Sequence, residues 1–302
     1  CQNSHLVFMR VLSLFDGISC GQLALKKAGI KVSEYYASEI DPHAIKITQK
    51  NFPKTIQIGN VQKIKKMDKK IDLLIGGSPC QGFSLAGRQL NFEDPRSKLF
   101  FDFLKILKKE KPKYFLLENV KMRSDIKDKI SELVGVQPIE INSKDYSGQS
   151  RTRLYWTNIP IKKLTKKNVK LKDVLEEGFV DREKAHCIDA SYFKGGNLKS
   201  YFQKHRRQLV FKGEISNKKT KDSKLIYKNG KESVYMKKPK KKTNHKYSKE
   251  IYRKLSPLEC ERLQTLPDHY TLVDGVSNTQ RYKAIGNGWT VNVLSQIFKG
   301  LK

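Results

Sequence analysis

Cys80 has the surroundings that best suit covalent chemistry in this 302-residue chain. It follows a short apolar run, in the turn Gly76-Gly77-Ser78-Pro79-Cys80, where the pattern predicts the carboxyl edge of a sheet. Structural cysteines usually lie inside an element, whereas a thiol on a loop at that edge is accessible to a ligand. Cys80 is therefore the candidate nucleophile. The segment after it, 81–98, contains Gly82 and Gly87 as candidate hinges and is typical of a loop that closes over a substrate.

Other polar side chains are expected near Cys80. Glu118-Asn119-Val120 ends the next predicted strand, which brings a carboxyl group to the same sheet edge, and Gln149-x-Arg151-x-Arg153 supplies two guanidinium groups. Each feature alone has an ordinary structural explanation, because a glutamate at a strand end is more often a helix cap or a surface charge. Only their combination indicates a reactive site.

A second ligand site is predicted where the first strand turns into the first helix. The run Phe15-Asp16-Gly17-Ile18-Ser19-Cys20-Gly21 lies at the position where open α/β sheets bind nucleotide-like ligands. Its spacing does not match G-x-G-x-x-G, which disfavours hydride chemistry on a nicotinamide cofactor. Glu39 follows the second strand and could accept hydrogen bonds from ribose hydroxyls, and Asn60 follows the third and could meet an adenine edge. The pattern indicates a nucleoside cofactor.

Composition limits the remaining possibilities. With 38% hydrophobic residues and no long apolar run, the chain is expected to be a soluble, cytoplasmic, monomeric protein with no membrane partner. Met9 is a candidate start, which makes residues 1–8 an extension. The five cysteines form no C-x-x-C pair, so neither a disulfide framework nor a metal site is predicted.

Positive charge is concentrated in one segment. The net charge is +31, and residues 161–254 hold 29 Lys and Arg against 10 Asp and Glu. Such a balance favours a nucleic-acid partner, although an A- and T-rich coding sequence would also inflate lysine. Lys218–Lys249 is either a disordered, solvated loop or an ordered binding face. Candidate base readers are Tyr201, the 205–208 run that contains Arg206, Arg207 and Gln208, and the 195–197 turn.

The pattern of elements predicts the α/β class. Apolar runs alternate with amphipathic stretches from residue 9 to 160, which indicates βαβ units and a parallel sheet. Strands are expected at 11–15, 33–37, 55–58, 71–75, 114–117, 137–142 and 154–158, and helices at 21–28, from 41, at 97–110, from 256 to 266 and at 291–298. We divide the chain into an α/β domain at 9–160, a smaller basic region at 161–254, and a return to the first domain at 255–302.

Taken in order, these motifs closely resemble the DNA (cytosine-5) methyltransferase family. The resemblance covers 10–160 and 255–300, and the Pro79-Cys80 and Glu118-Asn119-Val120 blocks carry most of its specificity. It implies a Rossmann-like sheet that binds S-adenosylmethionine. It also implies that 9–160 and 255–302 form the catalytic and cofactor-binding domain and that 161–254 is a target-recognition region. The compact, lysine-rich chain is typical of a bacterial or phage enzyme, as in restriction-modification systems, while Gly286-Asn287-Gly288-Trp289 is more similar to the animal de novo branch.

The resemblance also implies roles for individual residues. Cys80 would add to carbon 6 of a flipped cytosine in double-stranded DNA, Glu118 would donate to ring nitrogen 3, Arg153 would hold the carbonyl oxygen, and Arg151 would lie near the nucleophile. The implied cofactor contacts are Phe15, Asp16, Gly17, Gly21, Glu39, Ile40, Asn60, Val61, Pro79, Leu99, Asn287 and Trp289. The implied DNA contacts are Gln81, Ser84, Arg88, Gln149, Arg206, Arg207 and Arg262. Asn60 and Ile40 depart from the family pattern, which usually has an aspartate and an aromatic residue there.

Two other functions stay open at the sequence level. The tRNA-methylating branch of the same family shares the fold and the cysteine mechanism, but its Cys-Phe-Thr signature is absent and the basic insert is long enough to approach a DNA groove. A nucleic-acid-binding protein with a decayed catalytic domain is disfavoured because all the reactive positions are intact.

Overall fold

The computed structural model describes residues 8–78, 98–230, 232–237 and 251–302 and divides the chain into two compact units. Unit 1 takes its described residues from Cys1–Asn142, Thr152–Thr165 and Gly288–Lys302, and unit 2 comprises Ser143–Arg151 and Lys166–Asn287. The chain therefore leaves unit 1 twice and returns to it at Gly288.

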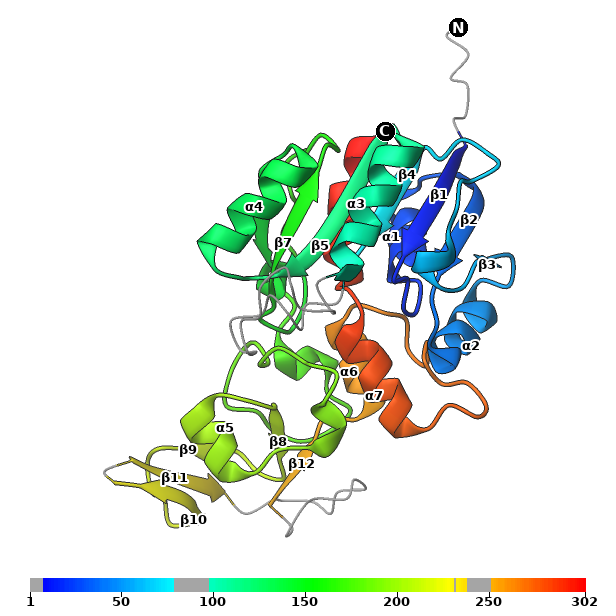
Figure 1. Ribbon diagram of the computed structural model, residues 1–302. Helices are drawn as coiled ribbons and strands as arrows, with labels where there is room; N and C mark the ends of the chain where they lie inside the picture. Colours follow the sequence, from blue (N-terminus) through cyan, green and yellow to red (C-terminus); the bar gives the residue numbers. More distant parts are fainter. Residues whose placement is uncertain (1–7, 79–97, 231, 238–250) are drawn as a thin grey trace, which may run out of the picture. The chain divides into compact units, whose positions relative to one another are not determined.

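Unit 1 is built on a seven-stranded sheet in the order β3-β2-β1-β4-β5-β7-β6 (Figure 1). Its strands are β1 (Met9–Leu14), β2 (Val32–Ser38), β3 (Ile56–Gln57), β4 (Leu73–Gly76), β5 (Tyr114–Val120), β6 (Ile139–Asn142) and β7 (Thr152–Thr157). Neighbours are parallel from β3 to β5, whereas β7 runs antiparallel to both β5 and β6. The predicted α/β class and the seven predicted strands are confirmed.

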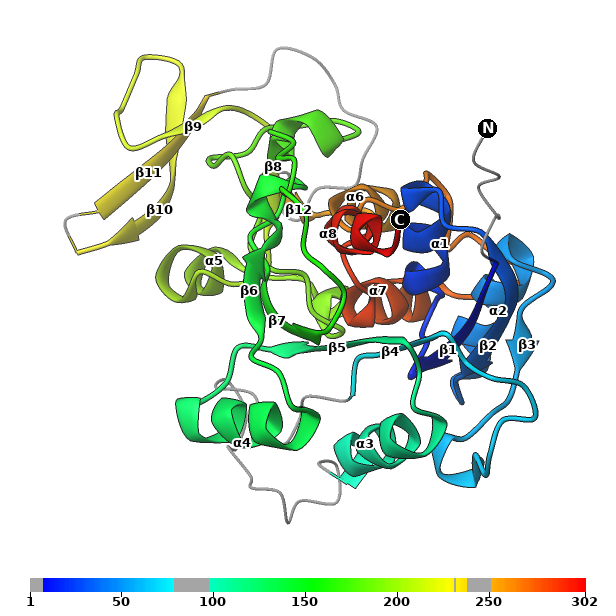
Figure 2. The ribbon, with the colours of Figure 1, turned by 90° about the horizontal axis from the view of Figure 1, so that it is seen from above.

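Helices cover both faces of this sheet. Figure 2 shows α3 (Lys98–Glu110) and α4 (Ser124–Val134) on one face and α1 (Cys20–Ala28) and α8 (Val291–Phe298) on the other. Strand residues alternate between the faces: Leu12 and Leu14 pack in the core under α3 and α4 together with Phe103 and Trp156, all fully buried. The same alternation turns Glu118, which follows Leu117, to the face that carries α8.

Short cap motifs set the helix ends, as the sequence predicts. Gly29 adopts φ 71° and closes α1, which places the turn before β2. Asp41 caps α2 (Pro42–Asn51) by accepting a hydrogen bond from the His43 amide at 2.9 Å, with Pro42 at the first helical position. Both signals depend only on residues close together in the chain, so they can be recognised in the sequence without the tertiary structure.

Unit 2 has its own core around α5 (Leu198–Lys204). Tyr201, Leu209, Phe211 and Met236 are its buried centre. The strands are β8 (Leu209–Phe211), β9 (Ile215–Ser216), β10 (Ser223–Asn229), β11 (Glu232–Lys237) and β12 (Tyr252–Lys254), in a three-stranded sheet β10-β11-β9 and a two-stranded sheet β12-β8. Its other helices are α6 (Pro257–Leu263) and α7 (Asn278–Asn287), and the 3-10 turns of the two units are Val61–Lys63, Ser143–Asp145, Leu171–Val174, Tyr192–Lys194 and Lys299–Leu301.

The structure differs from the sequence-based expectation in three places. Helices α4, α5 and α7 were not expected, although Gly135 closes α4 at φ 79° as Gly29 closes α1, and Asn197 caps α5. Residues 218–230 and 232–237 are ordered strands and turns, so this half of the lysine-rich stretch is not a disordered loop, while 238–250 lies outside the described residues. Residues 255–287 group with unit 2, since α6 and α7 pack within it, so the compact units divide the chain at other residues than 161 and 255.

Membrane-spanning helices were also considered. In the ranges that the structure describes, no helix is both long enough and apolar enough to cross a bilayer.

Candidate active site at the carboxyl edge of the unit 1 sheet

Glu118 is the centre of a buried polar cluster at the end of β5. One carboxyl oxygen lies 2.9 Å from Nε of Arg153, and the other accepts a hydrogen bond of 3.0 Å from Nε1 of Trp289. The Glu118 and Arg153 side chains are only 10% and 15% exposed. Because β5 and β7 pair antiparallel with Glu118 opposite Tyr155, two residues along β7 from Arg153, the sheet register brings the two charged groups together.

The strand before Cys80 packs directly against this cluster. A Cβ atom added at Gly77 would lie 2.8 Å from Nε1 of Trp289 and 2.9 Å from Oε2 of Glu118, so only glycine fits without displacing that hydrogen bond. Asn119 donates from Nδ2 to Oγ of Ser78 at 3.2 Å, and Ser78 is buried. The chain that leads into Cys80 is thus held against Glu118 and its neighbour.

Several predicted site residues lie outside the described residues. These are Pro79, Cys80, Gln81, Ser84 and Arg88. Their predicted roles therefore stay predictions. Gly77 and Ser78, the last described residues before this segment, lie against Glu118 and Asn119.

The β1–α1 loop adopts an unusual backbone conformation. Phe15 and Ser19 have φ values of 56° and 54° although neither is glycine, and Gly17 lies between them at φ 60°. Left-handed residues of this kind are rare and cluster at ligand sites, where the surrounding structure must hold them in place. Gly21, at the start of α1, would bring a Cβ to 2.4 Å from the Ile75 side chain and 3.3 Å from the Trp289 ring. Glycine at 21 therefore lets α1 approach the sheet and Trp289.

Asp16 and Glu39 hold this loop from two sides. Asp16 is buried and accepts hydrogen bonds from the Tyr35 hydroxyl at 2.8 Å and from the Ser19 hydroxyl. Burial raises the pKa of Asp16 from its ordinary 3.8 to about 6, against the opposing effect of these hydrogen bonds. The Glu39 carboxyl group accepts from the Gly17 amide at 2.8 Å and from the amides of Ile40 and Asp41 at 2.7 and 2.8 Å. The ends of β1 and β2 are thereby joined through one side chain.

The other predicted cofactor contacts have different environments. Ile40 is 71% exposed beside Glu39 and offers an apolar surface next to the loop. Asn60 caps the 3-10 turn by accepting from the Gln62 amide at 2.9 Å, while Val61 is 6% exposed and belongs to the core. Leu99 packs against the same core from α3. Packing in the core explains why Val61 is buried, so its burial gives no support to the predicted cofactor contact.

Arg151 lies in unit 2, where it makes structural contacts. Its Nη1 donates to the Ile188 carbonyl at 2.8 Å and contacts Sγ of Cys187 at 3.4 Å, and its Nη2 donates to the Gly286 carbonyl at 3.3 Å. Gly286 packs against the Asp189 backbone so closely that a Cβ would approach it to 2.3 Å. These contacts favour a positioning role over the direct catalytic role that the resemblance implies. They fix the end of α7, where Asn287 is exposed.

Gln149 is fully buried, which argues against the predicted DNA contact. Its Nε2 donates to the Leu263 carbonyl at 3.0 Å and to Oε1 of Gln264 at 2.9 Å, and its Oε1 accepts from the Ile188 amide at 3.2 Å. Gln264 in turn donates to the Ile285 carbonyl at 2.9 Å. A side chain whose amide group is saturated inside unit 2 is a structural bridge, and the sequence offers no signal that distinguishes it from a surface reader.

The remaining predicted DNA contacts divide by exposure. Arg206 is exposed and only 3.9 Å from Asp189, Arg207 donates to the Gly195 carbonyl at 2.7 Å, and Arg262 pairs with Asp268 at 2.6 Å.

Two of the candidate base readers are wrong: Tyr201 and Gln208 are fully buried, and Gln208 donates to the Tyr201 hydroxyl at 2.8 Å. Polar residue types suggested a surface, but the unit 2 core needs them to satisfy each other.

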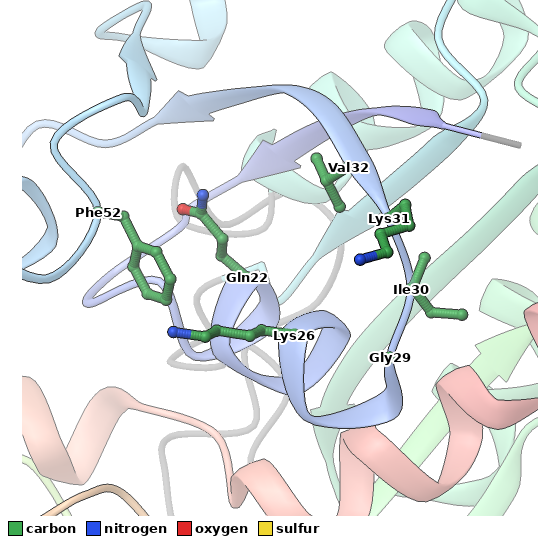
Figure 3. Close-up of a pocket in the computed structure, with 7 residues that line it drawn as sticks. All are labelled: Gln22, Lys26, Gly29, Ile30, Lys31, Val32 and Phe52. Carbon is green, nitrogen blue, oxygen red and sulfur yellow. The ribbon is translucent and has the colours of Figure 1, made fainter. Parts of the chain in front are cut away.

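A cavity in unit 1 does not coincide with the predicted site. It has a volume of about 300 Å³ and is lined by Gln22, Lys26, Gly29, Ile30, Lys31, Val32 and Phe52, near the end of α1 (Figure 3). None of these residues belongs to the Glu118 cluster or the β1–α1 loop. No group of three or more His, Cys, Asp or Glu side chains in the described residues could hold a metal ion.

Fold and site together define a class of protein. A doubly wound sheet with a strained loop after β1, an acid after β2 and a buried Glu-Arg-Trp cluster after β5 is that of a Rossmann-like methyltransferase. The family model for C-5 cytosine-specific DNA methylases matches residues 9–302, and the chain belongs to this family.

Individual relatives match different shares of the chain. The orphan methyltransferase M.Rho11sI of Bacillus phage rho11s is 46% identical over 116 residues, which are 37% of this chain and 23% of the phage protein. The type II methyltransferase M.NlaIV of Neisseria lactamica is 36% identical over 199 residues, 58% of this chain and 47% of the relative. The chain thus spans about half or less of the length of these two proteins. M1.ScrFI of Lactococcus lactis subsp. cremoris is 28% identical over 98% of this chain and 78% of its own length.

Solved structures share the fold over nearly the whole chain. The Entamoeba histolytica methyltransferase EhMeth superposes with a TM-score of 0.69 at 19% identity, covering 98% of this chain and 99% of that protein. A protein described as a DNA modification methyltransferase encoded within an E. coli prophage gives a TM-score of 0.62 at 25% identity, covering 97% and 98%. The Rossmann-like methyltransferase sheet is therefore confirmed.

Proposed function

We propose that this chain transfers a methyl group from S-adenosylmethionine to carbon 5 of a cytosine in double-stranded DNA, with Cys80 as the nucleophile. Family membership supports the proposal. The observation that carries it is the Glu118, Arg153 and Trp289 cluster, packed against Gly77 and Ser78 at the point where the chain enters the Cys80 segment. A buried acid beside the entry to a reactive thiol suits a reaction that needs a nucleophile and a proton donor together.

The chemistry assigns a role to each group. Carbon 5 of cytosine is a poor nucleophile until the Cys80 thiolate adds to carbon 6, which pushes an electron pair toward ring nitrogen 3. Glu118 donates a proton or hydrogen bond to that nitrogen, and Arg153 holds the carbonyl oxygen of the base. Both described partners of Glu118 are donors, so they fix its oxygens in place and orient the carboxyl group. Carbon 5 then takes the methyl group. Loss of its proton to water or another base, elimination of the Cys80 thiolate and return of the nitrogen 3 proton to Glu118 restore the aromatic ring.

The residues of the β1–α1 loop suit the proposed cofactor. S-adenosylmethionine supplies an electrophilic methyl group when bound. A Cβ at Gly17 would meet nothing within 4 Å, so open space lies against the loop, and Glu39 stands beside it with a carboxyl group that can accept from ribose hydroxyls. Phe15 is partly buried and Ile40 exposed, which gives two apolar surfaces for an adenine ring. We assign the methionine end to the vicinity of Gly21 and Trp289, which pack together in unit 1.

Duplex DNA is the proposed partner, and the target base must leave the helix because carbon 6 is not accessible in the stack. Flipping costs on the order of a few kcal/mol. Lysine and arginine contacts from the basic segment offset part of this cost, and Arg206 is an exposed candidate for a phosphate contact. The type II and phage methyltransferases among the relatives support DNA as the substrate class.

Covalent trapping tests the proposal. The full chain is incubated with cofactor and a duplex that contains 5-fluorocytosine, which stops the reaction at the adduct. We expect an adduct that Cys80→Ser abolishes and that Cys187→Ser, an exposed thiol in unit 2, leaves unchanged. An adduct in the Cys80→Ser variant would refute the nucleophile assignment. Parallel reactions on duplex DNA and on tRNA with labelled cofactor decide the substrate, and label in tRNA alone would overturn the DNA assignment.

A further inference from the structure

Unit 2 contains a cavity that none of the proposed catalytic residues explains. Its volume is about 570 Å³, in the range of small-ligand sites. It is lined by Asp181, Phe202, Gln203, His205, Asn217, Tyr227, Asn229, Glu232 and Val234. The residues come from α5, from the turn after β9 and from the β10–β11 hairpin.

Stacked aromatic rings form part of the cavity wall. The Phe202 and Tyr227 rings are stacked with their centroids 4.8 Å apart and an angle of 27° between their planes. Phe202 also stacks on Phe211 of the unit 2 core, at 6.2 Å, so the pair is anchored. The Tyr227 hydroxyl is buried and has no hydrogen-bond partner among the described residues. A buried hydroxyl without a partner is costly, and a ligand that reaches it would remove the cost.

The amide side chains of the cavity are free to bind. Gln203, Asn217 and Asn229 are exposed, and within the described part of the chain none of the three side chains makes a hydrogen bond. Other amides of the same unit are engaged: Asn197 caps α5, and Gln208 bonds inside the core. Amides without partners also occur elsewhere in unit 2, as at Asn168, but three of them line this one cavity.

The charge of the lining differs from that of its surroundings. Residues 198–237 hold 12 Lys and Arg against three Asp and Glu, yet no lysine or arginine lines the cavity, whereas Asp181 and Glu232 do. The basic residues of this stretch attract phosphates, and the carboxyl groups of the cavity lining disfavour them. Asp181 is held by Arg182 at 2.8 Å, while the Glu232 carboxyl group has no partner in the described residues. The lining suits a ligand that donates hydrogen bonds.

We propose that this cavity binds a nucleobase with an exocyclic amino group, adenine or cytosine, in the DNA that carries the methylated cytosine. Asparagine and glutamine amides form paired hydrogen bonds with the adenine edge, and a carboxyl group accepts from the cytosine amino group. The surrounding lysines hold the DNA backbone without reading its sequence. The cavity thus determines part of the target sequence. This inference rests on the proposed function, because it takes the partner to be DNA.

The test measures sequence preference in a duplex library. Positions around a fixed cytosine are randomised, the full chain and its variants methylate the library, and bisulfite sequencing gives the relative rate for each base. We expect the wild type to prefer adenine or cytosine at one position, and Asn217→Ala or Asn229→Ala to reduce that preference by about 5- to 100-fold, the discrimination of one paired contact. Asn168→Ala, an exposed amide of unit 2 outside the cavity, should leave it unchanged.

Two controls separate the possible failures. Lys228→Ala should slow methylation of all sequences alike, because a phosphate contact carries no base information. Unchanged preference in both asparagine variants would overturn the inference while the proposed function stands. If the wild type methylates no duplex, recovering bound DNA from the same library decides: a base preference in binding that the asparagine variants lose supports the cavity, and its absence overturns the inference as well.

Discussion

Replacing Trp289 with phenylalanine tests whether the Glu118 cluster acts in the reaction. The substitution removes the 3.0 Å hydrogen bond from Nε1 to the Glu118 carboxyl group and keeps an aromatic ring against Gly77 and Gly21. Arg153 still holds the other carboxyl oxygen at 2.9 Å. The variant therefore frees one oxygen without removing the charged partner.

The size of the effect follows from the burial of Glu118, whose side chain is 10% exposed. Leaving a buried polar group without its hydrogen-bond partner costs about 1–3 kcal/mol. If the whole of that energy orients the carboxyl group in the transition state, methyl transfer slows by about 5- to 150-fold, since each 1.4 kcal/mol is about tenfold in rate. A domain stabilised by about 5–15 kcal/mol tolerates such a loss, so the variant should fold.

The assay compares two tryptophans of the same unit. Trp156 is fully buried on the α3 and α4 face and donates to Oγ of Ser131 at 2.9 Å. It pairs with Leu117 in the register, next to Glu118, but its side chain packs in the core on the opposite face of the sheet from Glu118. Trp156→Phe removes the same kind of bond without touching the candidate site. Single-turnover methylation of a duplex by labelled cofactor, with urea unfolding of both variants, gives rate and stability for each.

The expected result is a slow Trp289→Phe enzyme and a Trp156→Phe enzyme that is less stable but transfers methyl groups at the wild-type rate. Equal rates in the two variants, or a Trp289→Phe rate that falls only as its folded fraction falls, would refute the role of the cluster. The wild-type chain, purified and assayed in the same way, is the reference for both variants.

Three further predictions concern stability. Because burial raises the pKa of Asp16 to about 6, the folded chain keeps a proton that the unfolded chain loses from about pH 4, and the free energy of unfolding should fall by up to about 3 kcal/mol as the pH rises to 6. Urea titrations at several pH values measure this dependence. Asp16→Asn should remove it, and an unchanged dependence would contradict the assignment. Arg253→Met leaves the fully buried Glu259 without its 2.7 Å partner and should cost about 3–5 kcal/mol in urea unfolding, whereas a near-neutral effect would show that Glu259 is satisfied otherwise. Gln149→Ala should lower stability by about 1–3 kcal/mol and leave the DNA affinity of the folded protein unchanged, and a weaker affinity at an equal folded fraction would restore Gln149 as a DNA contact.

Much of the site could be predicted because its residues follow strands of a parallel sheet. The carboxyl ends of such strands meet at one edge, so Asp16 after β1, Glu39 after β2 and Glu118 at the end of β5 were placed from their order alone. Gly29 and Pro42 gave the helix ends for a similar reason, since their backbone constraints are local. The alternation of apolar residues located the strands, because successive side chains along a strand point to opposite faces of the sheet.

Other features depend on contacts between distant parts of the chain. The hydrogen bond between Glu118 and Trp289 spans 171 residues, and the bridge from Gln149 to Gln264 spans 115, and no periodicity or spacing encodes either one. Tyr201 and Gln208 were expected on a binding surface because their types are polar, but they satisfy each other in the unit 2 core. Whether a polar side chain faces a ligand or a neighbour depends on where its partner lies in space.

The amino-acid sequence by itself determined the α/β class, the strands and their shared edge, and the family, because short-range patterns and motif order suffice for these. The tertiary structure alone decided which polar groups make hydrogen bonds within the fold, as Arg151 and Gln149 do, and which have no partner among the described residues, as with the amides of the unit 2 cavity. The physical reason is that a buried hydrogen bond needs a donor and an acceptor at about 3 Å, and only the folded chain brings such pairs together.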